Sequence, residues 1–264
     1  MTDTKESGFE KSIVKYLVEQ NGYEQGKSSD FDKDFAVDTE KLFRFLQETQ
    51  SEQIEKLNGL QSEQDKKKFL VRLDSEISKR GSVDVLRKGI KYYPADLIMF
   101  YQTPSENNKK AKEDFEKNIF SVTRQLHFSV NEKMRALDMC VFINGLPVIT
   151  FELKNQLTHQ NTKDAVEQYK TDRNPKDKIF NFKRCMVHFA VDDATIEFCT
   201  KLDGKGSWFL PFNKGYKDGA GNPPNPNGIM TSYLWEDILT KQKLALIIEN
   251  YAQVVEEEDK KQRK

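Results

Sequence analysis

The most hydrophobic stretch of the chain runs from residue 137 to residue 155, and it is rich in β-branched residues. This pattern predicts two strands, at about 136–143 and 147–153. Asn144-Gly145 lies between them, and such a pair is typical of a tight hairpin turn. The rest of the chain is much more polar, so we expect this hairpin to form the centre of the core.

Hydrophobic periodicity also predicts the elements on either side of the hairpin. Helical spacing is found in five segments: residues 9–21, 42–57, 69–77, 161–173 and 234–251. Strand patterns are found in three more: residues 120–128, 185–191 and 194–200. Residues 96–101 fit either a short strand or a buried turn of helix. The order of elements predicts an α/β fold, a mixed β-sheet flanked by helices, with a helical insertion after the first helix.

Composition excludes several classes of protein. The 264 residues include 42 basic and 42 acidic ones, so no net charge attracts nucleic acid or a membrane, and DNA contacts must come from local patches. The 18 Phe and 9 Tyr supply core volume, which argues against disorder. There is neither a long apolar run nor a secretion signal, so we expect a soluble, cytoplasmic protein without membrane contact. The cysteines lack CxxC spacing, which predicts free thiols.

Three charged residues interrupt the hydrophobic hairpin: Asp138, Glu152 and Lys154. Charges on core strands are costly unless they are paired or bind an ion. Mg²⁺ prefers oxygen ligands and takes one or two carboxylates, which Asp138 and Glu152 could supply together with the Leu153 carbonyl. Lys154 would emerge on the same strand face as Glu152 and could contact water or a phosphate. The spacing therefore predicts a metal-dependent phosphodiesterase site.

The register of the hairpin decides whether this site can form. A two-residue turn at Asn144-Gly145 pairs Asp138 with Phe151 and points Glu152 to the opposite face. A three-residue loop or a β-bulge instead pairs Asp138 with Glu152. The metal site therefore requires the odd register. With the tight hairpin, Glu152 and Lys154 would form only a surface pair.

The same residues resemble a known nuclease signature. Asp138 followed by Glu152-Leu153-Lys154 resembles the PD-(D/E)xK motif, with Leu137 where that superfamily loosely keeps a proline. Longer motifs resemble the N-terminal part of the restriction (R) subunit of type I restriction–modification enzymes. They are Asn118-x-Phe120 through Gln125, Arg135-x-x-Asp138, Asn144-Gly145-Leu146-Pro147, Glu152-Leu153-Lys154-Asn155, residues 182–192, 210–215 and 220–226, and Tyr233-Leu234-Trp235-Glu236.

The resemblance implies a restriction-endonuclease-like fold and Mg²⁺-dependent cleavage of double-stranded DNA. It implies one nuclease domain over residues 1–250, with the insertion at about 24–115, and a polar linker over 251–264 toward a motor domain that this chain lacks. ATP would act only through that motor. The implied partners are the methyltransferase and specificity subunits, of which the specificity subunit would recognise the DNA sequence.

Two further site residues follow from the resemblance. Glu10 matches a glutamate that reaches the metal from the first helix, but it could equally form a capping box with Ser7. Gln168 matches the first residue of a Gln-x3-Tyr motif, although Asp172 stands at the tyrosine position and the tyrosine here is Tyr169. Gln168 could orient the phosphate or Lys154.

Other candidate residues point to ordinary structural roles. His188 lies within the most apolar strand, which favours a core histidine. Gly204-Lys205-Gly206-Ser207 lacks the order of a phosphate-binding loop. The basic clusters at 66–68 and 109–112 favour solvated faces, with DNA phosphate contact as the alternative. The alternatives to a restriction nuclease are a non-catalytic module that docks onto the methyltransferase core and a free-standing resolvase or repair nuclease.

Overall fold

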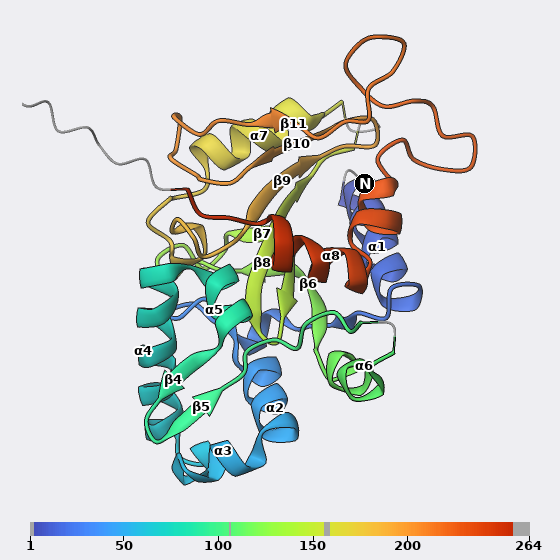
Figure 1. The fold of residues 1–264 in the computed structure, drawn as a ribbon. Helices are drawn as coiled ribbons and strands as arrows, with labels where there is room; N and C mark the ends of the chain where they lie inside the picture. The colour runs from blue at the N-terminus through green and yellow to red at the C-terminus, as the bar shows by residue number, and fades with distance from the viewer. Residues whose placement is uncertain (1–2, 106, 156–158, 256–264) are drawn as a thin grey trace, which may run out of the picture.

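A seven-stranded mixed sheet forms the centre of the computed structural model, which describes residues 3–105, 107–155 and 159–255 (Figure 1). The strand order is β1-β6-β7-β8-β9-β10-β11. The strands are β1 (Glu24–Gln25), β6 (Phe120–His127), β7 (Ala136–Ile143), β8 (Leu146–Leu153), β9 (Val187–Val191), β10 (Ile196–Cys199) and β11 (Leu210–Pro211). The β1–β6 and β8–β9 pairs are parallel and the others antiparallel. This confirms the predicted mixed sheet flanked by helices, consistent with a restriction-endonuclease-like fold.

Helices cover the two faces of this sheet. The helix α1 (Asp3–Glu19) packs on one face, in the main core that includes Met139 and Val141 of β7. The helix α7 (Thr162–Thr171) contributes Tyr169 to a second cluster on the other face, with Cys140 and Phe142 of the same strand. Because alternate residues of a strand point to opposite faces, Asp138 shares the α7 face with Cys140.

A second lobe lies beside the sheet, in the range expected as the helical insertion (Figure 1). Its helices are α2 (Thr39–Thr49), α3 (Ser51–Glu55), α4 (Glu63–Arg80), α5 (Ser82–Lys88) and α6 (Lys109–Glu116). Two small hairpins complete it, β2 (Phe31–Asp32) with β3 (Val37–Asp38), and β4 (Ile90–Tyr92) with β5 (Ala95–Leu97). The segment 96–101, whose sequence fits a strand or a turn of helix, therefore begins within the strand β5. The strand β1 also falls in the expected insertion but belongs to the central sheet.

The last segment differs from the single helix predicted over residues 234–251. It consists of the π-helical turn η5 (Leu234–Ile238), the helix α8 (Lys241–Leu246) and the π-helical turn η6 (Ile247–Tyr251). Thr240 has an extended backbone, and its hydroxyl accepts a hydrogen bond from the Lys243 N–H, so it caps a new helix. The apolar spacing continues across this break, which is why the sequence predicts one helix. None of the described helices has the length and apolarity to cross a bilayer.

Candidate active site

The β7–β8 hairpin combines a tight turn with a bulge. Asn144 (φ 49°) and Gly145 (φ 82°) both have left-handed backbones, and Ile143 pairs with Leu146, which defines a two-residue turn. The register then shifts between Val141 and Phe142, so that Val148 is the extra residue on β8. The odd register that the metal site requires is therefore present. It arises from the bulge, and the alternative of a longer loop is wrong.

The bulge brings the predicted acidic pair together. The last registered pair is Met139 with Phe151, which places Asp138 opposite Glu152 on the α7 face. The Asp138 Oδ2 accepts a hydrogen bond from the Leu153 N–H at 2.7 Å. Since the N–H and C=O of one strand residue point to the same side, the Leu153 carbonyl also faces β7. Lys154 lies two residues beyond Glu152 and thus on the same face.

Glu152 is fully buried, and only one of its two carboxylate oxygens is hydrogen-bonded within the described residues. Its Oε1 accepts a hydrogen bond from the Arg173 Nε at 2.6 Å. Its Oε2 is buried and has no hydrogen-bond partner among the described residues. Burial and, to a smaller extent, the charge of Asp138 raise the pKa of Glu152 to about 8, although Arg173 and Lys154 partly offset both effects. An unpartnered buried carboxylate oxygen is a position that a cation would stabilise.

Sequence reasoning missed Arg173. It follows α7 and is 5% exposed, with its guanidinium 5.5 Å from the centre of the Phe128 ring. Besides Glu152, it donates a hydrogen bond to the carbonyl of Ala136 at 2.9 Å. A buried glutamate requires a cationic partner, so a basic residue just beyond the helix that covers Glu152 was the available signal.

The side chains of Thr150, Tyr169 and His188 are buried and linked by hydrogen bonds next to the acidic pair. The Thr150 hydroxyl is 2.9 Å from the Tyr169 hydroxyl and 2.7 Å from the His188 Nδ1. Burial lowers the pKa of His188 to about 3 and raises the pKa of Tyr169 well above its ordinary value. The prediction that His188 is a core histidine is confirmed. Tyr169 and Arg173, rather than the half-buried Gln168, hydrogen-bond to β8.

Glu10 lies on the opposite side of the sheet from α7. The helix α1 begins at Asp3, so Ser7 is inside the helix and the capping-box interpretation is wrong. The Glu10 Oε1 accepts from the Arg124 Nε at 2.6 Å, and its Oε2 accepts from the Gln125 Nε2 at 3.0 Å. Gln125 occupies the β6 position opposite Asp138, between two registered pairs. Metal ligation by Glu10 stays a prediction.

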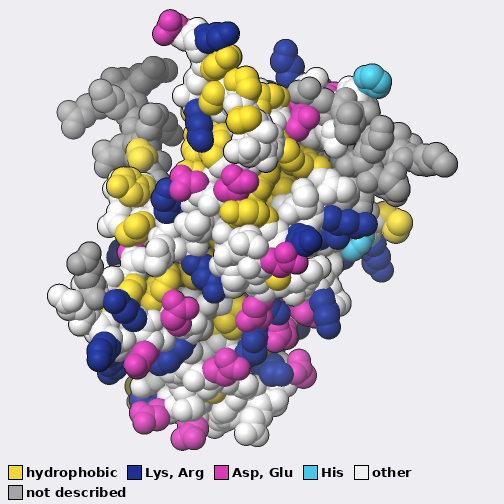
Figure 2. All heavy atoms as spheres, turned by 90° about the vertical axis from the view of Figure 1, so that its right-hand side faces the viewer, with side chains coloured by type: hydrophobic (Ala, Val, Ile, Leu, Met, Phe, Trp, Pro, Cys, Tyr) yellow, Lys and Arg dark blue, Asp and Glu magenta, His cyan; other side chains and the backbone are white. Residues whose placement is uncertain are grey.

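Acidic side chains lie beside the basic cluster of α4. On α4, Lys66 pairs with Glu63, and Lys68 lies 3.8 Å from Asp65. On the side of the molecule that carries α1, the described residues show basic and acidic side chains interspersed (Figure 2). DNA contact would therefore rest on local patches, as the zero net charge indicates.

The donor set of the hairpin fits a hard divalent cation. Two carboxylates meet at adjacent strand ends, a backbone carbonyl faces the same side, and one buried carboxylate oxygen receives no hydrogen bond from the described part of the chain. Oxygen-only donors of this kind suit Mg²⁺ and do not suit zinc, which prefers nitrogen and sulfur. These are the positions at which a metal would be held.

Comparisons with known proteins identify a family. The family model of the type I restriction enzyme R protein N terminus matches residues 3–207. Two Methanocaldococcus jannaschii proteins are similar to parts of the chain. One, named as a type I restriction enzyme MjaIXP endonuclease subunit, is 32% identical over 78 residues, or 28% of this chain. The other, named as the MjaVIIIP endonuclease subunit, is 33% identical over 79 residues, or 30% of this chain. The matched stretches span only 8% and 7% of these relatives.

Proposed function

Since the chain belongs to the family of type I restriction enzyme R protein N termini, we propose that it is a Mg²⁺-dependent endonuclease domain that hydrolyses phosphodiester bonds of double-stranded DNA. The observation that carries this proposal is the opposition of Asp138 and Glu152 across β7 and β8, with Lys154 on the same face. The names of the two relatives as endonuclease subunits support the same activity.

Asp138, Glu152 and the carbonyl of Leu153 would hold the Mg²⁺ ion. When bound, the ion supplies positive charge beside the scissile phosphate and makes water easier to deprotonate. The ion would also give the buried Oε2 of Glu152 a partner, since that oxygen has no hydrogen bond from the described residues. Gln168 and Glu10 remain secondary candidates, to orient the phosphate and to reach the ion from α1.

The residues of the chain would perform the remaining steps. The Lys154 ammonium, on the face of the two acids, orients the attacking water and contacts the phosphate. Arg173 keeps the Glu152 carboxylate in one orientation through its 2.6 Å hydrogen bond. Tyr169 is held by Thr150 and closes the α7 side against water, so the reacting groups lie in a poorly hydrated environment.

In the full-length protein, cleavage would be coupled to ATP-driven translocation by a motor domain. The methyltransferase and specificity subunits would bring the chain to DNA, and the specificity subunit would read the sequence. Recognition of bases by this chain is not part of the proposal. Its basic side chains would contact phosphates, and binding would weaken steeply with added salt.

The direct test is to soak crystals of the chain in Mn²⁺ and inspect the anomalous density. We expect a peak between Asp138 and Glu152 that disappears in the Glu152→Gln variant. The peak should accompany Mn²⁺-dependent nicking of supercoiled plasmid by the full-length subunit in its complex. A chain that binds Mn²⁺ only elsewhere, with nicking unchanged by Glu152→Gln, would refute the proposed site.

A further inference from the structure

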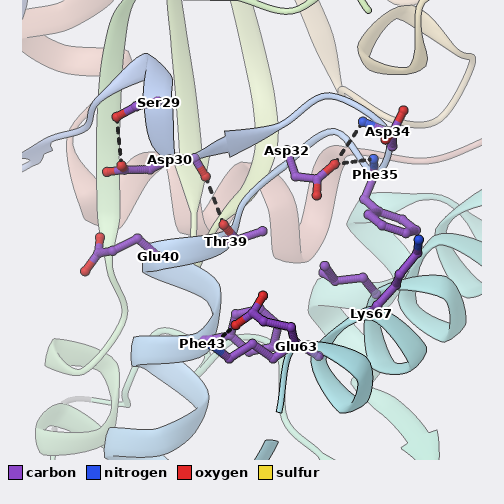
Figure 3. A pocket seen from close by; sticks show the side chains of 12 residues that line it. Ser29, Asp30, Asp32, Asp34, Phe35, Thr39, Glu40, Phe43, Glu63 and Lys67 are labelled. Atoms are coloured by element: carbon purple, nitrogen blue, oxygen red, sulfur yellow. Dashed lines mark hydrogen bonds and ion pairs between the residues drawn. The ribbon is translucent and has the colours of Figure 1, made fainter. Parts of the chain in front are cut away.

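A second group of acidic residues is distant in sequence from the β7–β8 hairpin. One carboxylate oxygen from each of Asp30, Asp38 and Glu40 lies within 4.8 Å of the other two. They surround the beginning of α2, beside a pocket between the β2–β3 hairpin and α4. Figure 3 shows Asp30 and Glu40 next to one another on one side of this pocket, with Asp34 on the other side. Asp38 is 1% exposed.

Two buried oxygen atoms, one in this group and one beside Asp38, have no hydrogen-bond partner within the part of the chain that the structure describes. They are the Asp38 Oδ2 and the hydroxyl of Thr123, a β6 residue that is itself 1% exposed. Both lie near one point, the position that a Cβ on Gly26 would occupy, at 3.4 Å and 2.3 Å. Glycine at position 26 keeps this point open. Buried oxygens that remain unpaired are costly, and a cation bound beside Asp38 would offset that cost.

The protein cations nearby do not satisfy these atoms. The Lys41 side chain pairs with Glu40, and its backbone N–H donates to the Asp38 Oδ1 at 3.0 Å. Arg44 also pairs with Glu40 and with Glu24. These contacts use Glu40 and one Asp38 oxygen, and they leave the Asp38 Oδ2 unpaired. Burial is also the main reason why the pKa of Asp38 is raised to about 6.

We propose that Asp30, Asp38 and Glu40 bind one divalent cation of the Ca²⁺ class at a site separate from the nuclease metal. The donors are oxygens only, which hard cations prefer, and Ca²⁺ accepts six to eight oxygen ligands in irregular geometry. The Thr123 hydroxyl supplies a neutral oxygen from β6. Glu40 is exposed, so water completes the coordination on that side.

The cation would connect the second lobe to the catalytic hairpin. The Asp38 N–H donates to the Gly145 carbonyl at 2.8 Å, at the turn that joins β7 to β8. Asp138 and Glu152 lie at the opposite end of the same hairpin. A bound cation would therefore fix the start of α2 against β6 and the turn, and would stabilise the fold independently of DNA cleavage.

The test uses the full chain with Asp138→Asn and Glu152→Gln, so that Ca²⁺ binding at the proposed active site is removed. Isothermal titration with Ca²⁺ should give one saturable equivalent, and Ca²⁺ should raise the Tm. Asp30→Asn or Glu40→Gln, added singly, should weaken binding at least about tenfold. Both residues are accessible, whereas Asp38→Asn would also weaken the cap of α2.

Asp34→Asn is the matched control, because it removes the same charge from the same pocket outside the acidic group. It should leave the Ca²⁺ affinity within about twofold. Equal weakening by Asp34→Asn and Asp30→Asn would show diffuse attraction and overturn the proposal. Absence of saturable binding would also overturn it, and Lys41 would then be the counter-ion. No readout depends on nuclease activity, so the two proposals can fail separately.

Discussion

The side chains of Glu152 and Arg173 form an ion pair that is closed off from solvent. The Arg173 Nε lies 2.6 Å from the Glu152 Oε1, and the two residues are 5% and 0% exposed, respectively. Such a pair contributes little net stability compared with apolar side chains, but loss of one partner leaves a buried charge. Arg173 therefore determines how Glu152 is oriented before any metal binds.

Arg173→Met should destabilise the chain by an amount that grows with pH. In the folded chain the pKa of Glu152 is about 8, above its ordinary 4.5, so stability falls as pH rises from about 4.5 to about 8, where the unfolded chain has already lost the proton that the folded chain keeps. Without Arg173 this pKa rises further, and the loss extends over a wider range. We expect the variant to lose about 3 kcal/mol or more of its free energy of unfolding at pH 9 and less at pH 6, measured by urea denaturation. Arg173→Lys, which keeps the charge, should be milder. An equal loss at both pH values would contradict this account.

Asp138→Ala should abolish nicking while assembly and DNA affinity change little. The carboxylate is proposed to hold the metal, and removal of one such ligand should lower the nicking rate by about a hundredfold or more. The measurement is plasmid nicking by the assembled complex, with gel-shift and sedimentation controls. Wild-type nicking by this variant would favour the non-catalytic docking module.

The register at Asp138 shows how much of the site could be predicted from the sequence. Alternation and the Asn144-Gly145 pair predict both strands, and the requirement that two acids share a face predicts an odd register. Val148 could not be identified as the bulged residue, because Leu146, Pro147 and Ile149 beside it on β8 are equally apolar and buried. Its place depends on packing against both faces of the sheet, which no local pattern reports.

The missed contacts involve partners that are distant in the sequence. Glu10 fits a capping box locally, but its carboxylate binds Arg124 and Gln125, more than 110 residues away. The helix also begins at Asp3, earlier than the local pattern predicts. Similarly, the Asp38 Oδ2 and the Thr123 hydroxyl come close to Gly26 only through contacts between distant segments: β1 pairs with β6, and the Asp38 N–H donates to the Gly145 carbonyl.

His188→Gln should flatten the acid limb of the stability profile. The folded pKa of His188 is about 3, below its ordinary 6.5, so the unfolded state binds more protons between these values. This contribution to stability is present above pH 6.5 and is lost as pH falls toward 3. The wild type should therefore lose roughly 2 kcal/mol more than the variant between pH 7 and pH 5. The exposed His159→Gln variant is the control, and equal slopes in all three proteins would contradict the prediction.

Gly145→Ala should damage both the fold and the metal site. A Cβ at this position would lie 2.4 Å from the Asp38 carbonyl oxygen and 2.7 Å from the Leu42 backbone nitrogen, and the φ of 82° is unfavourable for alanine. Backbone atoms cannot move aside as a flexible side chain can, so the hairpin turn must shift. We expect a loss of about 3 kcal/mol or more in the free energy of unfolding.

Gly221→Ala separates the two causes, because Gly221 has a φ of 101° but no atom within 4 Å of the added Cβ among the described residues. It should cost only about 1 kcal/mol. Because the turn and the bulge at Val148 together set the register that pairs Asp138 with Glu152, Gly145→Ala should also weaken Mn²⁺ binding, whereas Gly221→Ala should not. If both variants lose the same stability, the contact with Asp38 is unimportant. If Mn²⁺ affinity survives Gly145→Ala, the turn does not control the alignment of the acids.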